Sequence, residues 1–228
     1  MRRRAWLQGL AVAVMGSVSS ATWANAYNTF QTAIIRDDYI AVRKLLQRGM
    51  DPNTVDPRGW PALVSALARD SFRVAQVLMD APGLRVTDAN PLGETALMQA
   101  CIKGDLEFVQ QLLAKGARIN HPGWAPLHYA ASGNHPQSVA IAQLLLDQHA
   151  YIDAESPNRS TPLMLAAQYG SQDMVELLLQ AGADVHARNE LGLGAIDFAQ
   201  RSEREFMVRL LQRASQAQRS SSGARPTW

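Results

Sequence analysis

The stretch that decides the fold is STPLMLAAQYGSQDMVELLLQAGADV, residues 160–185. It opens with Thr161 and Pro162, and proline is tolerated at the first helical position, so Thr161 is predicted to be the N-cap of a helix. A second apolar run, Leu177–Leu179, is followed by Gly182. Glycine suits the left-handed residue just after a helix, so the stretch predicts two short helices in sequence.

The same pattern recurs along the chain. Clear copies are GETALMQAC at residues 93–101 and APLHYAA at residues 125–131, each followed by a leucine-rich segment. Weaker copies begin near Trp60 and Ala195, and another lies near Phe30. The anchor apolar residues of five copies, spaced by 34, 30, 36 and 33 residues, are Leu63, Leu97, Leu127, Leu163 and Ile196. This pattern, with a period near 33, resembles the ankyrin repeat.

The resemblance implies an all-α repeat solenoid of stacked helix-turn-helix ankyrin repeats with β-hairpin fingers. Residues 27–213 would form about six repeats, with predicted bounds 27–56, 57–88, 89–120, 121–153, 154–186 and 187–213. A single repeat cannot bury its own apolar face, so the stack must be continuous and polar at its two ends. Residues 214–228 are polar and are predicted to form a flexible C-terminal tail.

The first 26 residues are typical of a cleaved signal peptide. Three arginines at positions 2–4 precede a short apolar run, and Ala24-Asn25-Ala26 is an A-x-A cleavage site. Cleavage between Ala26 and Tyr27 predicts a periplasmic chain without membrane insertion, exported by the Sec or the twin-arginine route. The formal net charge of +2 would fall to −1, and residues 27–212 carry 16 basic and 20 acidic side chains.

The sequence offers no catalytic motif, so we expect no enzyme activity, cofactor or metal site. His121, His128 and His135 are seven residues apart, but the resemblance gives His128 a structural role, a hydrogen bond to a neighbouring finger. Cys101 occupies the same repeat position as Ala131 and Ala167, and we expect it to be buried and inert. No basic stripe follows a helix face, which argues against nucleic-acid binding.

The concave face of the array is therefore the candidate binding surface. The resemblance assigns partner contacts to finger positions and to the exposed side of each first helix, namely Arg58, Trp60, Arg69, Leu92, Glu94, Lys103, His121, Trp124, Asn158, Ser160, Tyr169 and Leu191. Tryptophan, tyrosine and arginine dominate interface hot spots. Trp60 and Trp124, which occupy equivalent finger positions, are therefore candidate partner contacts. Alternatively, each tryptophan simply packs against the adjacent finger.

The fourth repeat is irregular. Its finger is about three residues shorter than the others, and the turn between its helices is about three residues longer. Such changes in repeat proteins often carry recognition, although neutral drift of loop length is an equal alternative.

These features predict a non-catalytic scaffold that binds an unidentified protein partner in the periplasm and is monomeric when free. It would serve as an accessory or protective factor for a periplasmic enzyme. The alternatives are an immunity or inhibitor protein against a toxin, and a host-directed secreted effector.

Overall fold

A computed structural model describes residues 20–223 of the chain. Most of the predicted signal peptide, residues 1–19, and the last five residues of the predicted tail lie outside this range. The helices are α1 (Ser20–Ile35), α2 (Tyr39–Gln47), α3 (Ala62–Ala68), α4 (Phe72–Met79), α5 (Ala96–Lys103), α6 (Leu106–Ala114), α7 (Pro126–Ser132), α8 (Ser138–Asp147), α9 (Pro162–Tyr169), α10 (Gln172–Gln180), α11 (Ala195–Arg201) and α12 (Glu205–Gly223).

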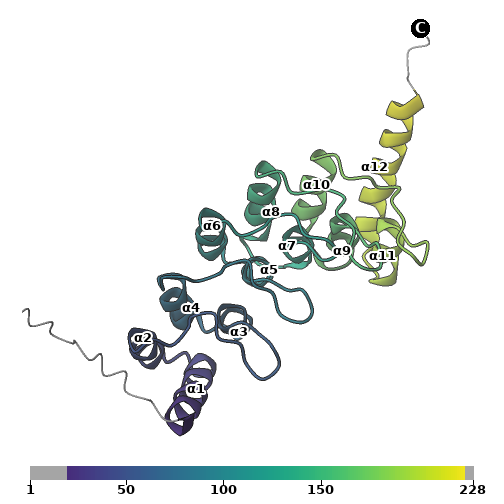
Figure 1. Cartoon of the computed structure of the whole chain (residues 1–228). Coiled ribbons are helices and arrows are strands. Elements are labelled where there is room, and N and C mark those ends of the chain that lie inside the picture. Colours follow the sequence, from purple (N-terminus) through teal and green to yellow (C-terminus); the bar gives the residue numbers. More distant parts are fainter. Residues whose placement is uncertain (1–19, 224–228) are drawn as a thin grey trace, which may run out of the picture.

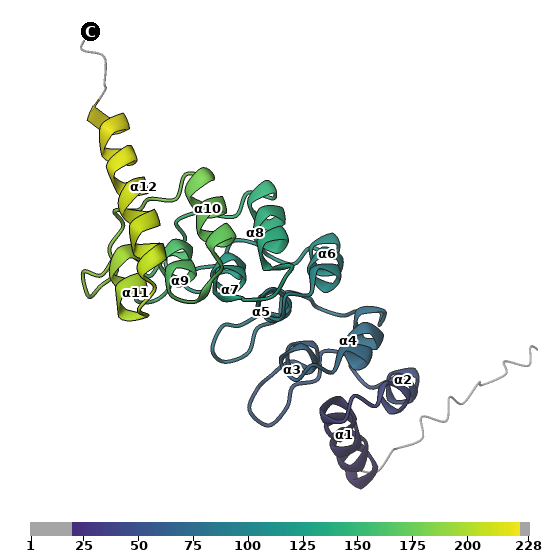
Figure 2. The ribbon, with the colours of Figure 1, turned by 180° about the vertical axis from the view of Figure 1, so that it is seen from behind.

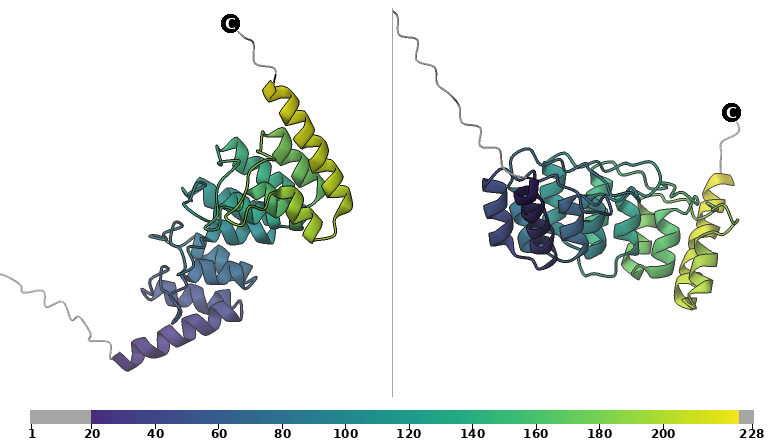
Figure 3. Two further views of the ribbon diagram at one scale, coloured as in Figure 1. Left: turned by 90° about the vertical axis from the view of Figure 1, so that its right-hand side faces the viewer. Right: turned by 60° about the horizontal axis from the view of Figure 1, so that its bottom comes forward.

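The helices are stacked in two rows. Consecutive helices pair as hairpins, from α1 with α2 to α11 with α12. The odd-numbered helices form an inner row in which each contacts the next, and the loops before them project to one side (Figure 1, Figure 2). The even-numbered helices form the outer row, and Figure 3 shows the resulting elongated array. The predicted all-α repeat solenoid is confirmed.

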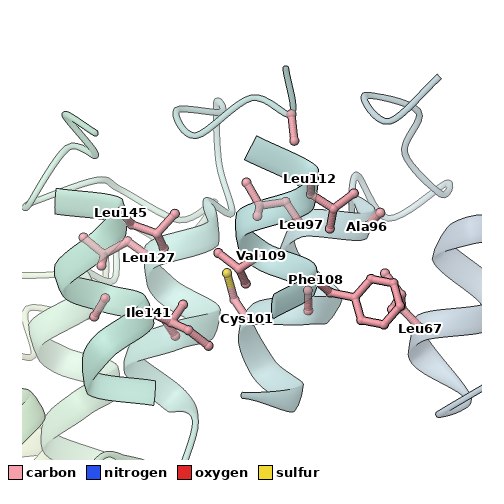
Figure 4. Close-up of a cluster of buried hydrophobic side chains, with 14 of the residues drawn as sticks. Leu67, Ala96, Leu97, Cys101, Phe108, Val109, Leu112, Leu127, Ile141 and Leu145 are labelled. Atoms are coloured by element: carbon pink, nitrogen blue, oxygen red, sulfur yellow. The ribbon is translucent and has the colours of Figure 1, made fainter. Parts of the chain in front are cut away.

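Small residues let the inner helices approach closely. The paired alanines Ala130 and Ala131 in α7, and Ala166 and Ala167 in α9, are completely buried. Cys101 of α5 lies in the same kind of position, among Val109, Leu127 and Ile141 (Figure 4). Burial raises the pKa of its thiol, so Cys101 stays in the protonated, unreactive form, as expected.

Hydrogen bonds also join each hairpin to its neighbour. In the turn between α11 and α12, Arg204 donates from Nη1 to the carbonyl oxygens of Ala166 and Ala167 and from Nη2 to that of Gly170, at 2.6–3.2 Å. These carbonyls belong to the last turn and C-cap of α9, where a helix leaves carbonyl groups short of internal partners; that of Ala166 also accepts from the Gly170 amide at 2.9 Å. At the other end of the array, the hydroxyl of Ser71 donates to the carbonyl oxygen of Ile34 at 2.7 Å.

Three local expectations are corrected. Thr161 is the N-cap residue of α9, as predicted, but its side chain makes no capping bond, because its buried Oγ1 has no hydrogen-bond partner. Thr95 does cap α5 through its side chain, accepting from the Met98 amide at 3.4 Å. Among the described residues, the fingers contain no extended β-hairpin, and two of them close through single antiparallel bridges. The residues from 214 to 223 belong to α12 and not to a flexible tail.

The additional turns of α12 are docked on the array. Gln218 donates from Nε2 to the carbonyl oxygen of Ala183 at 2.8 Å and accepts from the Val185 amide at 3.2 Å. Ser215 is buried at 9% exposure. These contacts with the segment after α10 explain why α12 extends into residues whose polar composition suggested a flexible tail.

Candidate functional site

The fingers before the inner helices follow a common geometry. In four of them a buried polar residue, Asp56, Asn90, Ser156 or Asn189, accepts hydrogen bonds from main-chain amides further along the same finger. Its own amide donates to the carbonyl oxygen four residues on, at 2.9–3.0 Å. These bonds replace a β-ladder and hold each finger tip at a fixed position.

The finger before α7 is the exception. In the other fingers, the first residue of the inner helix stands thirteen positions after a left-handed residue: Gly49 to Ala62, Gly83 to Ala96, His149 to Pro162, and Gly182 to Ala195. From Gly116 to Pro126 the interval is ten, which confirms the predicted shortening by three residues. The turn between α7 and α8 has five residues, against two or three in the other helix pairs, so the predicted lengthening is also present.

A hollow of about 640 Å³ lies on the concave face around this short finger. We call it the central hollow. It is lined by Leu92, Glu94, Ile102, Trp124, His128, Tyr129, Ser132, Asn158, Ser160, Leu165, Gln168, Tyr169 and Phe198. The fingers before α5 and α9 contribute opposite sides of this set, and the short finger contributes Trp124 between them. The shortened finger thus leaves room between two longer ones.

His128 and Trp124 form the base of the short finger. His128 is fully buried; its Nδ1 accepts from the Ala125 amide at 3.1 Å, so its Nε2 donates to the Ser160 carbonyl oxygen at 3.1 Å. The predicted bond from His128 to a neighbouring finger is therefore present. Burial lowers the pKa of His128, which keeps the imidazole neutral. The Trp124 ring packs edge-on against His128, with ring centroids 5.4 Å apart.

Glu94 and Tyr129 form a polar side of the central hollow. The Tyr129 hydroxyl donates to Glu94 Oε1 at 2.9 Å, and Asn90 Nδ2 donates to Oε2 at 2.7 Å. Burial, the hydrogen bond to Glu94 and the charge of Glu94 raise the pKa of Tyr129, so the hydroxyl remains a donor. The rings of Trp124 and Tyr129 are 6.3 Å apart and inclined at 78°.

The central hollow brings together half of the predicted contact residues: Leu92, Glu94, Trp124, Asn158, Ser160 and Tyr169. Leu92 is 69% exposed and Tyr169 is 56% exposed, so both present apolar surface beside the hollow. Ser160 differs from the expectation because it is 1% exposed and its amide donates to Ser156 Oγ. It supports the neighbouring finger and offers no side-chain surface to a partner.

The other six predicted residues, Arg58, Trp60, Arg69, Lys103, His121 and Leu191, do not line the central hollow. Arg58 forms an ion pair with Asp56 at 2.9 Å and lies over the Trp60 ring, 5.1 Å from its centroid. Lys103 pairs with Asp70 at 2.6 Å.

Arg69, His121 and Leu191 complete that set. Arg69 donates to Ser65 Oγ at 3.3 Å, and His121 Nδ1 lies 3.0 Å from the carbonyl oxygen of its neighbour Pro122. Leu191 is 75% exposed on the last finger. Arg69 lies in the N-terminal half of the array, His121 in the short finger and Leu191 in the last finger.

The sequence prediction missed Tyr129, Leu165 and Phe198 as lining residues. Each stands two positions after an anchor residue, and the equivalent residues of the two preceding repeats, Ser65 and Gln99, are polar and buried. A comparison of this one repeat position would have found them, since it changes from polar to large and apolar in the second half of the array.

Comparison with known proteins agrees with this architecture. A family model described as ankyrin repeats (3 copies) matches residues 30–122, 84–156, 120–189 and 137–220. The chain belongs to the ankyrin repeat family. Ankyrin repeat proteins are in general non-catalytic scaffolds for protein–protein interaction, and that is the general role of this fold.

Three relatives with similar sequences differ widely in length and kind. The chain is 34% identical over 158 residues to the ankyrin repeat protein YahD of Escherichia coli (strain K12), which covers 66% of this chain and 78% of YahD. It is 29% identical over 161 residues to the human transient receptor potential cation channel subfamily A member 1, or 67% of this chain but 14% of the channel. Human SH3 and multiple ankyrin repeat domains protein 2 is 30% identical over 176 residues, or 75% of this chain and 9% of that protein.

The part of the chain that the structure describes holds neither a metal-binding cluster nor a membrane-spanning helix. Within residues 20–223, no three side chains among His, Cys, Asp and Glu come together as a potential metal site. The helices of the same range are also too short or too polar to cross a bilayer.

Proposed function

We propose that this ankyrin array is exported to the periplasm, where it binds one partner protein through the central hollow and acts as an accessory or protective factor for that partner. The observation that carries the proposal is the hollow itself, which the short finger opens between two fixed fingers. Its walls combine aromatic side chains with exposed Leu92 and Tyr169. Buried aromatic anchors surrounded by apolar surface are the usual centre of a protein interface.

Export is supported by the position of the predicted cleavage site within α1. Trp23, Ala24 and Asn25 are exposed, whereas the core residues Phe30 and Ile34 follow Tyr27. Removal of the chain before Tyr27 would leave these core residues in place. We expect N-terminal sequencing of the protein from osmotic-shock fluid to begin at Tyr27; an intact Met1 in the cytoplasm would contradict export.

Site-specific photocrosslinking in intact producing cells tests the binding surface. The photoreactive residue replaces Leu92 at the edge of the central hollow, and in a matched control it replaces Gln143, which is exposed on the outer helix α8. We expect one discrete adduct from position 92 and none from position 143. The same adducts from both positions, or none from either, would reject this surface.

The two equivalent tryptophans provide the second arm. Trp124→Ala removes an aromatic anchor of the hollow and should cost about 2 kcal/mol of binding, or roughly thirtyfold in affinity. Trp60→Ala changes a ring that lies outside the hollow and packs under Arg58, so it should leave the adduct unchanged. Equal losses of the adduct in the two variants would show that binding depends on the stability of the helix stack and not on the central hollow.

The accessory role is tested on the captured partner. If that partner is an enzyme, we expect its activity to persist longer during incubation with the purified array than without it. A partner whose activity falls on binding would favour the inhibitor or immunity alternative and would contradict the protective role.

A further inference from the structure

The central hollow has an uneven distribution of charge. Three of its rings belong to Trp124, Tyr129 and Tyr169, and its lining includes the carboxylate of Glu94. No lysine or arginine is among the described residues that line it. His128 adds no positive charge, because its Nδ1 accepts a hydrogen bond and its burial favours the neutral imidazole. The hollow therefore has a formal charge of −1 and aromatic walls.

Glu94 differs from the carboxylates that pair elsewhere in the array. Asp37, Asp56, Asp70, Glu155 and Asp197 each form an ion pair with an arginine or a lysine.

The hydrogen bonds to the Glu94 carboxylate come instead from two neutral groups, the Tyr129 hydroxyl and the Asn90 amide. Neutral donors orient a carboxylate but do not cancel its charge. Because each carboxylate oxygen can accept a second hydrogen bond, Glu94 keeps acceptor capacity toward the hollow.

Among possible occupants, an arginine side chain complements these groups best. The guanidinium is planar, stacks on aromatic faces and donates to a carboxylate through a rigid fork. It is also more weakly hydrated than an ammonium group, which favours entry into a half-buried site. A volume of about 640 Å³ exceeds that of a single side chain, so flanking residues of the partner can enter with it. An acidic side chain would be repelled by Glu94.

We infer that the central hollow receives an arginine side chain of the partner protein, held between the aromatic rings and the Glu94 carboxylate. This inference rests on the proposed function, since it specifies the chemistry of the partner at the same site. It assigns Glu94 a direct contact with the partner and gives Tyr129 and Asn90 the role of orienting it.

Titration of the chain with capped tripeptides tests the inference without knowledge of the partner. The probes are acetyl-Gly-Arg-Gly-amide and the same peptide with citrulline, which has nearly the shape of arginine but no charge. Binding is followed by the NMR signal of the Trp124 indole N–H. We expect saturable shifts with the arginine peptide and at least about tenfold weaker binding of the citrulline peptide.

Two charge-neutralising variants complete the test. Glu94→Gln should weaken binding of the arginine peptide by at least about tenfold. Glu190→Gln removes the same charge from an exposed finger position outside the hollow and should leave binding within twofold. Equal binding of the two peptides, or an unchanged affinity in Glu94→Gln, would overturn the inference. An adduct at position 92 in cells together with no preference for arginine would leave the proposed function standing and reject only the arginine.

Discussion

The finger before α5 and the finger before α7 belong to adjacent repeats but solve the same structural problem differently. In the longer finger, Asn90 Oδ1 binds the amides of Leu92 and Glu94, and a bridge joins Ala89 to Thr95. In the shorter finger, the Ala125 amide donates to the side chain of His128, which comes from the helix itself. The long finger before α11 has an equivalent bond, from the Gly194 amide to Asp197. The two fingers therefore differ in length and in the contacts of Asn90, whereas the bond from the first turn of the inner helix occurs with fingers of either length.

The length of one loop determines where the concave face is hollowed. The neighbouring fingers keep their thirteen-residue interval, so they stand on both sides of the shorter one. Trp124 lies at a position equivalent to that of Glu94, three residues before the anchor, but at the bottom of the gap. The inner helices remain regularly packed throughout.

The largest effect is expected when the finger before α7 is lengthened to match the finger before α5. In the graft, the nine residues 117–125 are replaced by the twelve residues 84–95 of the preceding finger. We expect the arginine tripeptide to lose measurable binding, because the added residues would occupy the central hollow. Isothermal titration calorimetry measures the affinity, and circular dichroism checks that the helical content is retained.

Two further grafts separate length from side-chain identity. One retains tryptophan at the position equivalent to Trp124, and we expect it to bind as poorly as the first graft. The other introduces residues 84–95 in place of the equally long segment 183–194 of the last finger, away from the hollow. Retained binding in the tryptophan-bearing graft would show that the ring, and not the finger length, determines the site.

The next largest effect is expected from His128→Ala. The change leaves the Ala125 amide and the Ser160 carbonyl without their side-chain partner and opens a cavity at a fully buried position. We expect the free energy of unfolding to fall by about 3 kcal/mol in urea denaturation. Asp197→Ala is the matched control: Asp197 accepts from the Gly194 amide in the same way but is partly exposed, so about 1 kcal/mol should be lost. Similar losses in the two variants would contradict a special role for His128.

A smaller effect concerns the left-handed residue of each finger. Gly93 has φ +80° with open space around it, whereas Arg159 has φ +61° at the equivalent position of a later finger. Gly93→Ala should destabilise the fold by about 1 kcal/mol through backbone strain alone. Arg159→Gly should raise the melting temperature slightly, because relief of strain exceeds the added flexibility of the unfolded chain and the lost surface ion pair. Thermal unfolding of both variants checks the opposite signs.

The smallest effect is a pH dependence at the base of the short finger. The pKa of His128 is lower in the folded chain than its ordinary value near 6.5, because burial disfavours the charged ring. Between the two values the unfolded chain binds more protons, so stability falls as the pH decreases from about 7 through the folded pKa. We expect His128→Gln to reduce this slope in urea titrations between about pH 7.5 and pH 5. An identical slope in the variant would assign the pH dependence to other groups.

The fold could be predicted because its determinants are local and repeated. The alanine pairs, the leucine runs and glycines such as Gly182 recur in one register, and each occupies its expected place in a helix pair. The N-cap position of Thr161 in α9 could be predicted, but the absence of its side-chain capping bond could not. The amide of that residue lies against Met164 Sδ at 3.4 Å, and its hydroxyl is enclosed without a partner, which depends on packing beyond the local sequence.

The candidate site was predictable only in part. Repeat alignment identified Leu92, Trp124 and Tyr169, because finger tips and inner-helix surfaces have fixed offsets from the anchor. It could not separate them from Arg58 and Lys103, whose charges are paired with Asp56 and Asp70 in three dimensions. The signal peptide, the cellular location and the identity of the partner stay predictions and proposals.

The long α12 has a consequence for how separate molecules meet. The two ends of a stack of similar units have complementary shapes. A second copy can therefore pack end to end against the first, and repeated contacts of this kind form a filament. The exposed side chains along α12 include Glu205, Arg209, Gln212 and Arg213. Placing a second copy against them would remove water from these polar and charged groups, at a cost in free energy. We therefore expect α12 to disfavour end-to-end stacking of separate copies.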